Sequence, residues 1–227
     1  MIPIVGGTDK MGASSLLGAL RTYARIDGEM TYDNWQTAVR AGRTFCTCGP
    51  LMEFRVEGRE PISTIAMAAS GGHVDVEWDV ASVIAPMTRV DLIVNGEVRE
   101  RQTVKSDRDK GHWRINIDRT GWLALLIRGH HHDGKDVILA HSSPVKVQLE
   151  HSPLLAAADG VSILDQIEAV TAYVEHLGTK TDPNAYKRMM LTLTAAHRAL
   201  HNRLHAQGHY HHHTTTHHHA EHGGRVI

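Results

Sequence analysis

The spacing of hydrophobic positions changes twice along the chain and divides it into four segments. Between Leu51 and Leu149 apolar side chains alternate with polar ones, whereas before and after that stretch they recur every three or four residues. Alternation is typical of strands with one buried face, and the wider spacing is typical of amphipathic helices. We therefore predict a mainly β protein with flanking α elements. The predicted segments are 1–50, 51–150, 151–207 and 208–227.

The alternating segment predicts an antiparallel β-sandwich of the immunoglobulin-like kind. "MEFRVEG" and "HVDVEWDV" each place an apolar side chain at every second position. Asn95-Gly96 separates two apolar runs, the pattern of a two-residue hairpin. Further strands are predicted in "HWRINIDR", "WLALLIRG" and "PVKVQLE", with turns at 118–121 and 130–134. About six or seven short strands over roughly 100 residues are typical of that class of sandwich.

The first 50 residues have α/β character. Residues 2–5 form a short apolar run, which predicts a strand, and Gly6-Gly7-Thr8-Asp9 follows as a turn. "TYDNWQTAVRAGR" predicts a helix that Thr31 caps and Gly42 ends. A lone strand and helix cannot stand by themselves, because the strand needs neighbours to satisfy its backbone hydrogen bonds.

The segment after His151 predicts a helical hairpin. Its first helix is expected to begin at Ser162, and its second at Asp182 and Pro183. Of the 19 histidines in the chain, 11 lie in the second helix and the tail that follows it. Three of them, spaced four residues apart, would form a stripe along the second helix and are weak candidates for metal ligands. These are His197, His201 and His205.

The final stretch, 208–227, is of low complexity, and we expect it to be disordered. Its histidines bind soft divalent metals to some degree, so metal scavenging is an alternative role for the tail. A polar helix edge and a solvated tail need no ligand, so a plain structural interpretation also stands for both groups of histidines. The same holds for His130, His131 and His132, which are expected at an exposed hairpin tip.

The charge balance limits the classes of partner. Lys plus Arg number 24 and Asp plus Glu number 25, so the chain lacks the basic excess expected of a nucleic-acid or anionic-membrane partner. The apolar runs fall short of the roughly 18 residues that span a bilayer, and no signal-peptide pattern is visible. The sequence is compatible with both a cytoplasmic and an exported parent protein. Cys46 and Cys48 are too few for a disulfide framework and are expected to be free, partly buried thiols.

The sequence lacks the motifs of several enzyme classes, including the Gly-x-Ser-x-Gly elbow, the P-loop and His-Glu-x-x-His. Asp9 is a remaining candidate, because its carboxylate is predicted at the point where a strand ends and a loop begins. Catalytic residues of α/β barrels lie at this position. The alternative role of Asp9 is that of a turn residue or helix cap.

Several short stretches of the sequence resemble the carboxy-terminal part of PHP-superfamily metallohydrolases of the CehA/McbA (carbaryl hydrolase-like) family. The resemblance runs from about residue 2 to residue 149, and its most specific pieces are "GTDKM" and "AGRTF" with a later Gly49-Pro50. The resemblance lies in the stretches "PIVGGTDKMGASSLLGALRTYARI", "TYDNWQTAVRAGRTFCTCGPLMEFRVEG", "VDLIVNGEV", "GWLALLIRG" and "AHSSPVKV".

The resemblance implies a distorted α/β barrel that holds divalent metals through His-x-His, Glu, His and a late Asp, followed by a β-sandwich. Asp9 stands at the late metal-ligand position. PHP proteins often have Asp-x-His there, whereas this chain has Lys10 and Met11. Cys48 stands where relatives tend to have a small polar residue such as Asn. By resemblance, residues 1–50 are then the last strand and helix of such a barrel.

The implied activity is metal-assisted hydrolysis of an ester, carbamate or phosphoester in a small-molecule substrate. Zinc, manganese or iron would activate a water in the complete protein, and Arg43 and Lys10 are weak candidates to stabilise the developing oxyanion. One carboxylate cannot hold a catalytic metal, so we predict that this chain alone is inactive and that the metal belongs to the complete protein. Arg43 is alternatively a helix-terminal cation. The rival function is a β-sandwich that acts as a binding or interaction module.

Overall fold

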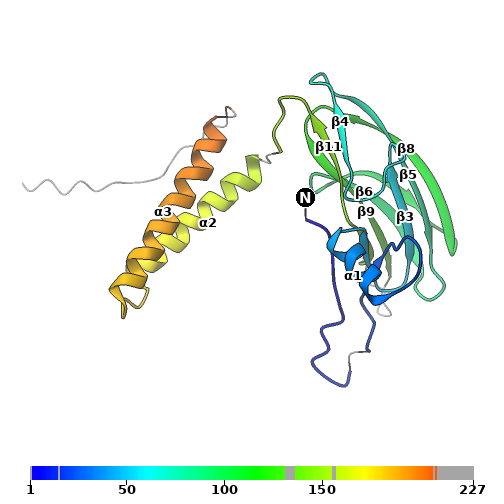
Figure 1. Cartoon of the computed structure of the whole chain (residues 1–227), viewed down its shortest axis with the longest axis horizontal. Helices are drawn as coiled ribbons and strands as arrows, with labels where there is room; N and C mark the ends of the chain where they lie inside the picture. Colours follow the sequence, from blue (N-terminus) through cyan, green and yellow to red (C-terminus); the bar gives the residue numbers. More distant parts are fainter. Residues whose placement is uncertain (1, 15, 131–135, 155–156, 207, 209–227) are drawn as a thin grey trace, which may run out of the picture. The chain divides into compact units, whose positions relative to one another are not determined.

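The computed structural model describes residues 2–14, 16–130, 136–154, 157–206 and 208. The chain forms two compact units, Met1–Leu154 and Leu155–Ile227. The first unit is built from two β-sheets, and the second contains two helices (Figure 1). The protein is therefore mainly β, followed by two C-terminal helices, which confirms this coarse part of the predicted fold.

The larger sheet has the order β1-β2-β10-β9-β11-β4, and β6 pairs with β9 and carries β7. The smaller sheet has the order β3-β5-β8. All pairs are antiparallel except β4 with β11. The strands of the larger sheet are β1 (Arg21–Ala24), β2 (Thr44–Thr47), β4 (Thr64–Met67), β6 (Met87–Val94), β7 (Glu97–Thr103), β9 (Gly121–His130), β10 (Asp136–Ser142) and β11 (Val145–Leu149). Those of the smaller sheet are β3 (Leu51–Val56), β5 (Gly72–Ala81) and β8 (Arg108–Ile117).

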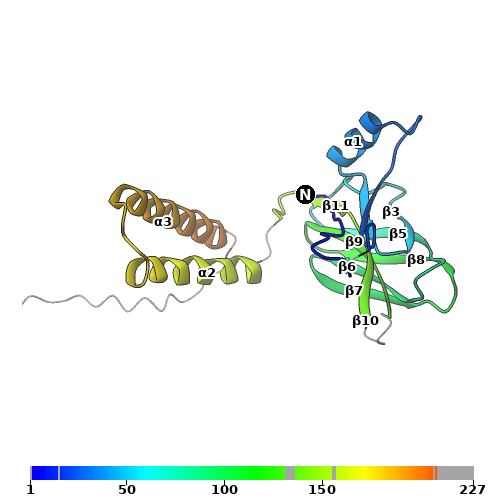
Figure 2. The same ribbon diagram turned by 90° about the horizontal axis from the view of Figure 1, so that it is seen from below.

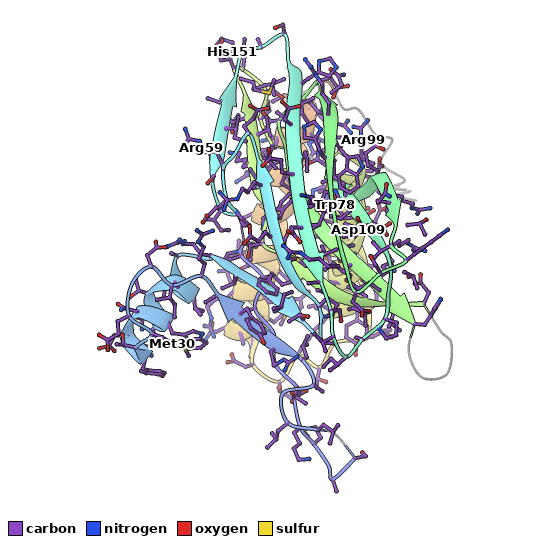
Figure 3. All side chains as sticks on the ribbon, turned by 90° about the vertical axis from the view of Figure 1, so that its right-hand side faces the viewer. Met30, Arg59, Trp78, Arg99, Asp109 and His151 are labelled. Atoms are coloured by element: carbon purple, nitrogen blue, oxygen red, sulfur yellow. The ribbon has the colours of Figure 1, made fainter. Side chains whose placement is uncertain are left out.

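The core of the first unit lies between the two sheets. Val76 and Trp78 of β5 and Leu125 and Ile127 of β9 belong to one cluster of buried side chains. Figure 3 labels Trp78. Burying such side chains stabilises the fold by about 1.5–3 kcal/mol each, because apolar surface leaves water. The alternation that predicted β3 and β5 is thus confirmed, and their polar positions face outward.

The predicted hairpin at Asn95-Gly96 is confirmed as the connection between β6 and β7. Both residues have positive φ, 52° and 90°, as a type I′ turn requires. The Asn95 side chain also accepts a hydrogen bond of 3.0 Å from the backbone nitrogen of Trp122. This turn therefore also holds the start of β9.

The strand predicted for residues 2–5 is wrong. That segment has no regular secondary structure, and Pro3 removes one backbone donor from it. Its backbone bonds instead to side chains: Ile4 N donates to Ser143 Oγ (3.0 Å), and Thr44 Oγ1 donates to Ile4 O (2.6 Å). The strands of this region are β1 and β2, and β2 pairs with β10. The larger sheet therefore begins before residue 50.

The helix predicted after Thr31 is confirmed as α1 (Tyr32–Arg40). Thr31 Oγ1 accepts a hydrogen bond of 3.2 Å from Asn34 N, and Gly42 follows the helix with φ of 73°. A Cβ at Gly42 would lie 2.6 Å from a Pro3 side-chain atom and 2.8 Å from one of Ile62. Gly42 therefore has both a backbone and a packing reason to be glycine.

The second unit is the predicted helical hairpin, α2 (Ala157–His176) with α3 (Pro183–His205) (Figure 2). Asp182 caps α3 as predicted, since its Oδ1 accepts hydrogen bonds from Asn184 N and Ala185 N. The predicted start of the first helix at Ser162 is wrong, because α2 begins at Ala157. No described helix is long and apolar enough to cross a membrane. Nearly all of the predicted tail, and the histidines at 131–132, lie outside the described residues.

Candidate functional site

Asp9 lies on an exposed loop rather than at the end of a strand. Its φ of 47° is in the left-handed region, which Asp adopts more readily than most residues. The neighbouring Thr8 Oγ1 lies 3.3 Å from Leu20 O, so the loop is tied to the start of β1. The side chains of Asp9 and Lys10 are both exposed. This conformation fits the alternative role of Asp9 as a turn residue.

The residues around Asp9 do not fit a resident metal ion. In the part of the chain that the structure describes, no group of three or more His, Cys, Asp or Glu side chains is arranged to hold one. A catalytic zinc normally has three protein ligands. No catalytic step through a metal can therefore be derived from the described residues.

Arg43 makes ion pairs with two carboxylates. Its Nη1 and Nη2 donate to Asp27 at 2.6 and 3.2 Å, and Nη2 lies 3.5 Å from Glu60 Oε2. The hydrogen bonds and charge of Arg43 lower the pKa of Asp27, and the bond to Asp27 raises the pKa of Arg43. These partners explain Arg43 without an oxyanion.

Arg43 and the segment that leads to Asp9 lie on opposite faces of the β1–β2 pair. Gly6 N donates a hydrogen bond of 2.8 Å to Thr22 Oγ1, and Thr22 is the cross-strand partner of Cys46. Arg43 lies on the other face, where Tyr23 and Phe45 are also found, because side chains alternate along a strand. The structure thus does not bring the predicted cation to Asp9.

A cavity of about 310 Å³ lies on the Arg43 side of this strand pair, against β3. Tyr23 and Phe45 stack at a centroid distance of 5.2 Å and form one wall. Met52 and Phe54 of β3 add apolar surface. The cavity is large enough for a small organic ligand, since ligand pockets begin at about 300 Å³.

Charged side chains meet in the lining of this cavity. Glu60, in the loop between β3 and β4, forms ion pairs with three arginines: with Arg25, with Arg43 and, at 3.7 Å, with Arg55. The Glu60 side chain is 26% exposed, so this carboxylate is partly withdrawn from water. Only Arg43 was singled out from the sequence. The other three residues are scattered along the chain and form no motif that would have marked them.

The predicted histidine stripe is present on α3. The rings of His197 and His201 lie 6.0 Å apart, and those of His201 and His205 lie 4.0 Å apart. His197 Nε2 is 2.8 Å from Glu168 Oε1 on α2, so the stripe takes part in the contact between the two helices. A metal role for it stays a prediction.

The two cysteines are free, as expected. Cys46 is buried and Cys48 is exposed. Burial raises the pKa of the Cys46 thiol, which reduces the fraction present as reactive thiolate. Cys46 therefore acts as a packing residue of β2.

No protein-family model matches the chain, and no curated protein matches it. Among solved structures, the chain is distantly similar to the sulfur carrier protein SoxY from Chlorobium limicola f thiosulfatophilum, with a TM-score of 0.29 and 16% identity over 43% of this chain and 78% of that one. It is also similar to fibronectin(III)-like modules of Clostridium thermocellum CbhA, with a TM-score of 0.31 and 12% identity over 45% of this chain and 100% of that one.

A third likeness, to a structure titled pT26-6p, has a TM-score of 0.25 and 7% identity over 77% of this chain and 44% of that one. Such distant likenesses carry no information on activity.

Proposed function

We propose that this chain is the C-terminal part of a PHP-type metallohydrolase of the CehA/McbA kind, with an immunoglobulin-like two-sheet unit beside the catalytic barrel. The observation that carries the proposal is that Asp9 stands exposed on a segment rich in exposed apolar side chains. Met11 is 88% exposed, Leu16 is 76% and Leu17 is 81%. Clustered exposed apolar side chains are typical of an interaction surface.

Exposed apolar side chains also occur in the loop before α1. Met30 is 89% exposed and lies away from the sheets (Figure 3), and Tyr32 at the start of α1 is 70% exposed. A catalytic part that packs here would cover these side chains and meet Asp9. It would supply the histidine and carboxylate ligands that Asp9 needs as companions, since a single carboxylate does not hold a catalytic ion.

The first test is hydrolysis by the purified chain. p-Nitrophenyl acetate, an aryl carbamate and p-nitrophenyl phosphate are each supplied with zinc, manganese or iron(II). We expect no turnover above that of metal and buffer. Metal-dependent turnover by the chain alone, lost in Asp9→Asn, would overturn the proposal.

The second test restores the missing ligands. The protein segment encoded upstream of Met1, or by a neighbouring gene, is expected to contain His-x-His, and it is expressed together with this chain. The combined protein should hydrolyse one of the three substrates, and Asp9→Asn should abolish that activity. Asp118→Asn, at an exposed position between β8 and β9, is the matched control and should leave it unchanged. Full activity of Asp9→Asn in the combined protein would contradict the proposal.

Ligand binding by the two-sheet unit is the second candidate function, and the cavity beside Tyr23 and Phe45 favours it. A carbohydrate platform of exposed tryptophans is less favoured, because Trp78 is buried and Trp113 packs against the same core. The binding function predicts that a small molecule raises the melting temperature of the whole chain, which a thermal-shift measurement detects. A screen of small organic acids, amides and sugars without any such shift would argue against it.

A further inference from the structure

Three arginines from separate parts of the chain meet a single carboxylate in the lining of the apolar cavity. Arg25 directly follows β1, Arg43 precedes β2, and Arg55 belongs to β3, whereas Glu60 comes from the loop between β3 and β4. Arginine is the residue best suited to bind a carboxylate, because its planar fork donates two parallel hydrogen bonds. Glu60 thus occupies the position that an anionic ligand would take.

The contacts of Glu60 leave part of this binding capacity unused. Arg43 and Arg55 lie 3.5 and 3.7 Å from its oxygens, longer than the 2.7–3.2 Å of an N–H···O hydrogen bond. Arg43 is held on its other side by Asp27, and Arg25 and Arg55 are 51% and 36% exposed. Arg55 also lies 3.9 Å from Glu53 Oε2, so the carboxylates of Asp27, Glu53 and Glu60 balance the three arginines. A carboxylate from solvent can therefore reach the exposed Arg25 and Arg55 only by taking the place of Glu60.

The loop that carries Glu60 is held near both ends by backbone hydrogen bonds. Glu57 and Gly58 have φ of 50° and 66° and form a tight turn that Val56 and Arg59 close. Ile62 has φ of 71°, and its backbone nitrogen donates a hydrogen bond of 2.6 Å to Pro144 O. These contacts fix the loop backbone independently of the Glu60 side chain.

We propose that this cavity binds a small aromatic carboxylate, which displaces Glu60 from Arg25 and Arg55 and packs its ring against Tyr23 and Phe45. The volume suits a single ring with a short substituent. The apolar walls disfavour a fully hydrated anion such as inorganic phosphate, because burying charge without apolar contact loses hydration for little return. This inference gives the second candidate function its ligand class and is independent of Asp9.

Benzoate is the probe, with benzamide as a neutral molecule of the same shape and acetate as an anion without a ring. Binding to the whole chain is measured by isothermal titration calorimetry. We expect benzoate to bind at least about tenfold more tightly than either control, since a charge-assisted hydrogen bond and a buried ring each contribute about that factor. Equal affinity for benzoate and benzamide, or the absence of benzoate binding, would overturn the proposal.

Three variants test the role of each side chain. Glu60→Gln removes the internal competitor and should tighten benzoate binding about tenfold, whereas Arg55→Gln should weaken it about tenfold. Tyr23→Ala should weaken benzoate more than acetate. Arg59→Gln, an exposed residue of the same loop (Figure 3), is the matched control and should bind benzoate like the wild type.

The sign of the Glu60→Gln effect separates competition from a purely structural role. If Glu60 only stabilised the loop, the variant would melt at a lower temperature and bind benzoate more weakly, and the proposal would be refuted. Asp9→Asn should bind benzoate like the wild type, so failure here and failure of the hydrolase proposal are distinguishable.

Discussion

Asp91 on β6 is a fully buried carboxylate, and its replacement by Asn tests the electrostatics of the larger sheet. Its side chain has no solvent exposure. Arg128 Nε donates to its Oδ2 at 2.8 Å, Arg89 Nε lies 3.2 Å from its Oδ1, and Arg101 Nε lies 3.6 Å from the same atom. Asp91→Asn keeps the shape of the side chain, removes its charge and replaces one acceptor oxygen by a donor NH2 group.

The expected loss in the free energy of unfolding depends on the contacts that the arginines keep in Asp91→Asn. Removing one partner of a buried ion pair costs about 3–5 kcal/mol, because the other charge stays desolvated and unpaired. Here Arg89 and Arg128 are 32% and 23% exposed, and Asp136 stays 3.1 Å from Arg89 and 3.9 Å from Arg128. We therefore expect a reduced loss of about 2–3 kcal/mol for Asp91→Asn. Asp136→Asn is the control and should cost less than about 1 kcal/mol, since Asp136 is 38% exposed.

Urea unfolding followed by tryptophan fluorescence measures both values. All four tryptophans lie in the unit Met1–Leu154, so the signal reports on the sheets and not on the helical hairpin. Linear extrapolation to zero urea gives the free energy of unfolding of each variant. If Asp91→Asn destabilised the protein no more than Asp136→Asn does, the buried charge would not need its arginines and the reasoning would be refuted.

Three further predictions rest on single positions. Gly42→Ala should lower the free energy of unfolding by about 2–4 kcal/mol in the same urea assay. Alanine disfavours the positive φ at this position, and its Cβ would lie within 3 Å of two side chains. An unchanged free energy of unfolding would contradict this prediction. Iodoacetamide should label Cys48 in the native protein and Cys46 only after unfolding, as mass spectrometry of the peptides can show. Asp27→Asn should lower the stability at neutral pH. The Arg43 contact lowers the folded-state pKa of Asp27, so the contribution of Asp27 is fully present above the unfolded pKa of about 3.9 and is lost as the pH falls through the lower folded value. In urea unfolding at decreasing pH, the stabilities of the two proteins should therefore converge.

Strict alternation made the central strands predictable from the sequence. In β3 and β5 every second side chain enters the core, and the period of two is unbroken. β10 was missed because Val137, Ile138 and Leu139 are consecutive apolar residues, and its pairing with β9 shifts register between Ile138 and Ala140. A bulge of this kind interrupts the alternation on which the prediction depends.

The cavity could not be predicted, because its residues become neighbours only through long-range pairing. Tyr23 and Phe45 meet because β1 and β2 pair, and Glu60 in the loop after β3 meets Arg25 at the end of β1. A scattered charge in a sequence carries no information on its partner. Arg43 was named from the sequence as a candidate to stabilise an oxyanion, whereas its partners in the structure are Asp27 and Glu60.

The residues that carry the family resemblance differ in how far the fold explains them. In the stretch "AGRTF" and the Gly49-Pro50 that follows it, the fold itself accounts for several residues. Gly42 is required by the backbone after α1, Thr44 hydrogen-bonds to Ile4 and Ser143, and Thr47 Oγ1 donates to Pro50 O. These residues therefore stabilise the unit. Asp9 is different, because its side chain is exposed and Asn adopts its left-handed backbone equally well. Exposed positions of this kind change stability by no more than about 0.5 kcal/mol when substituted. A loss of activity in Asp9→Asn would therefore report on chemistry and not on folding.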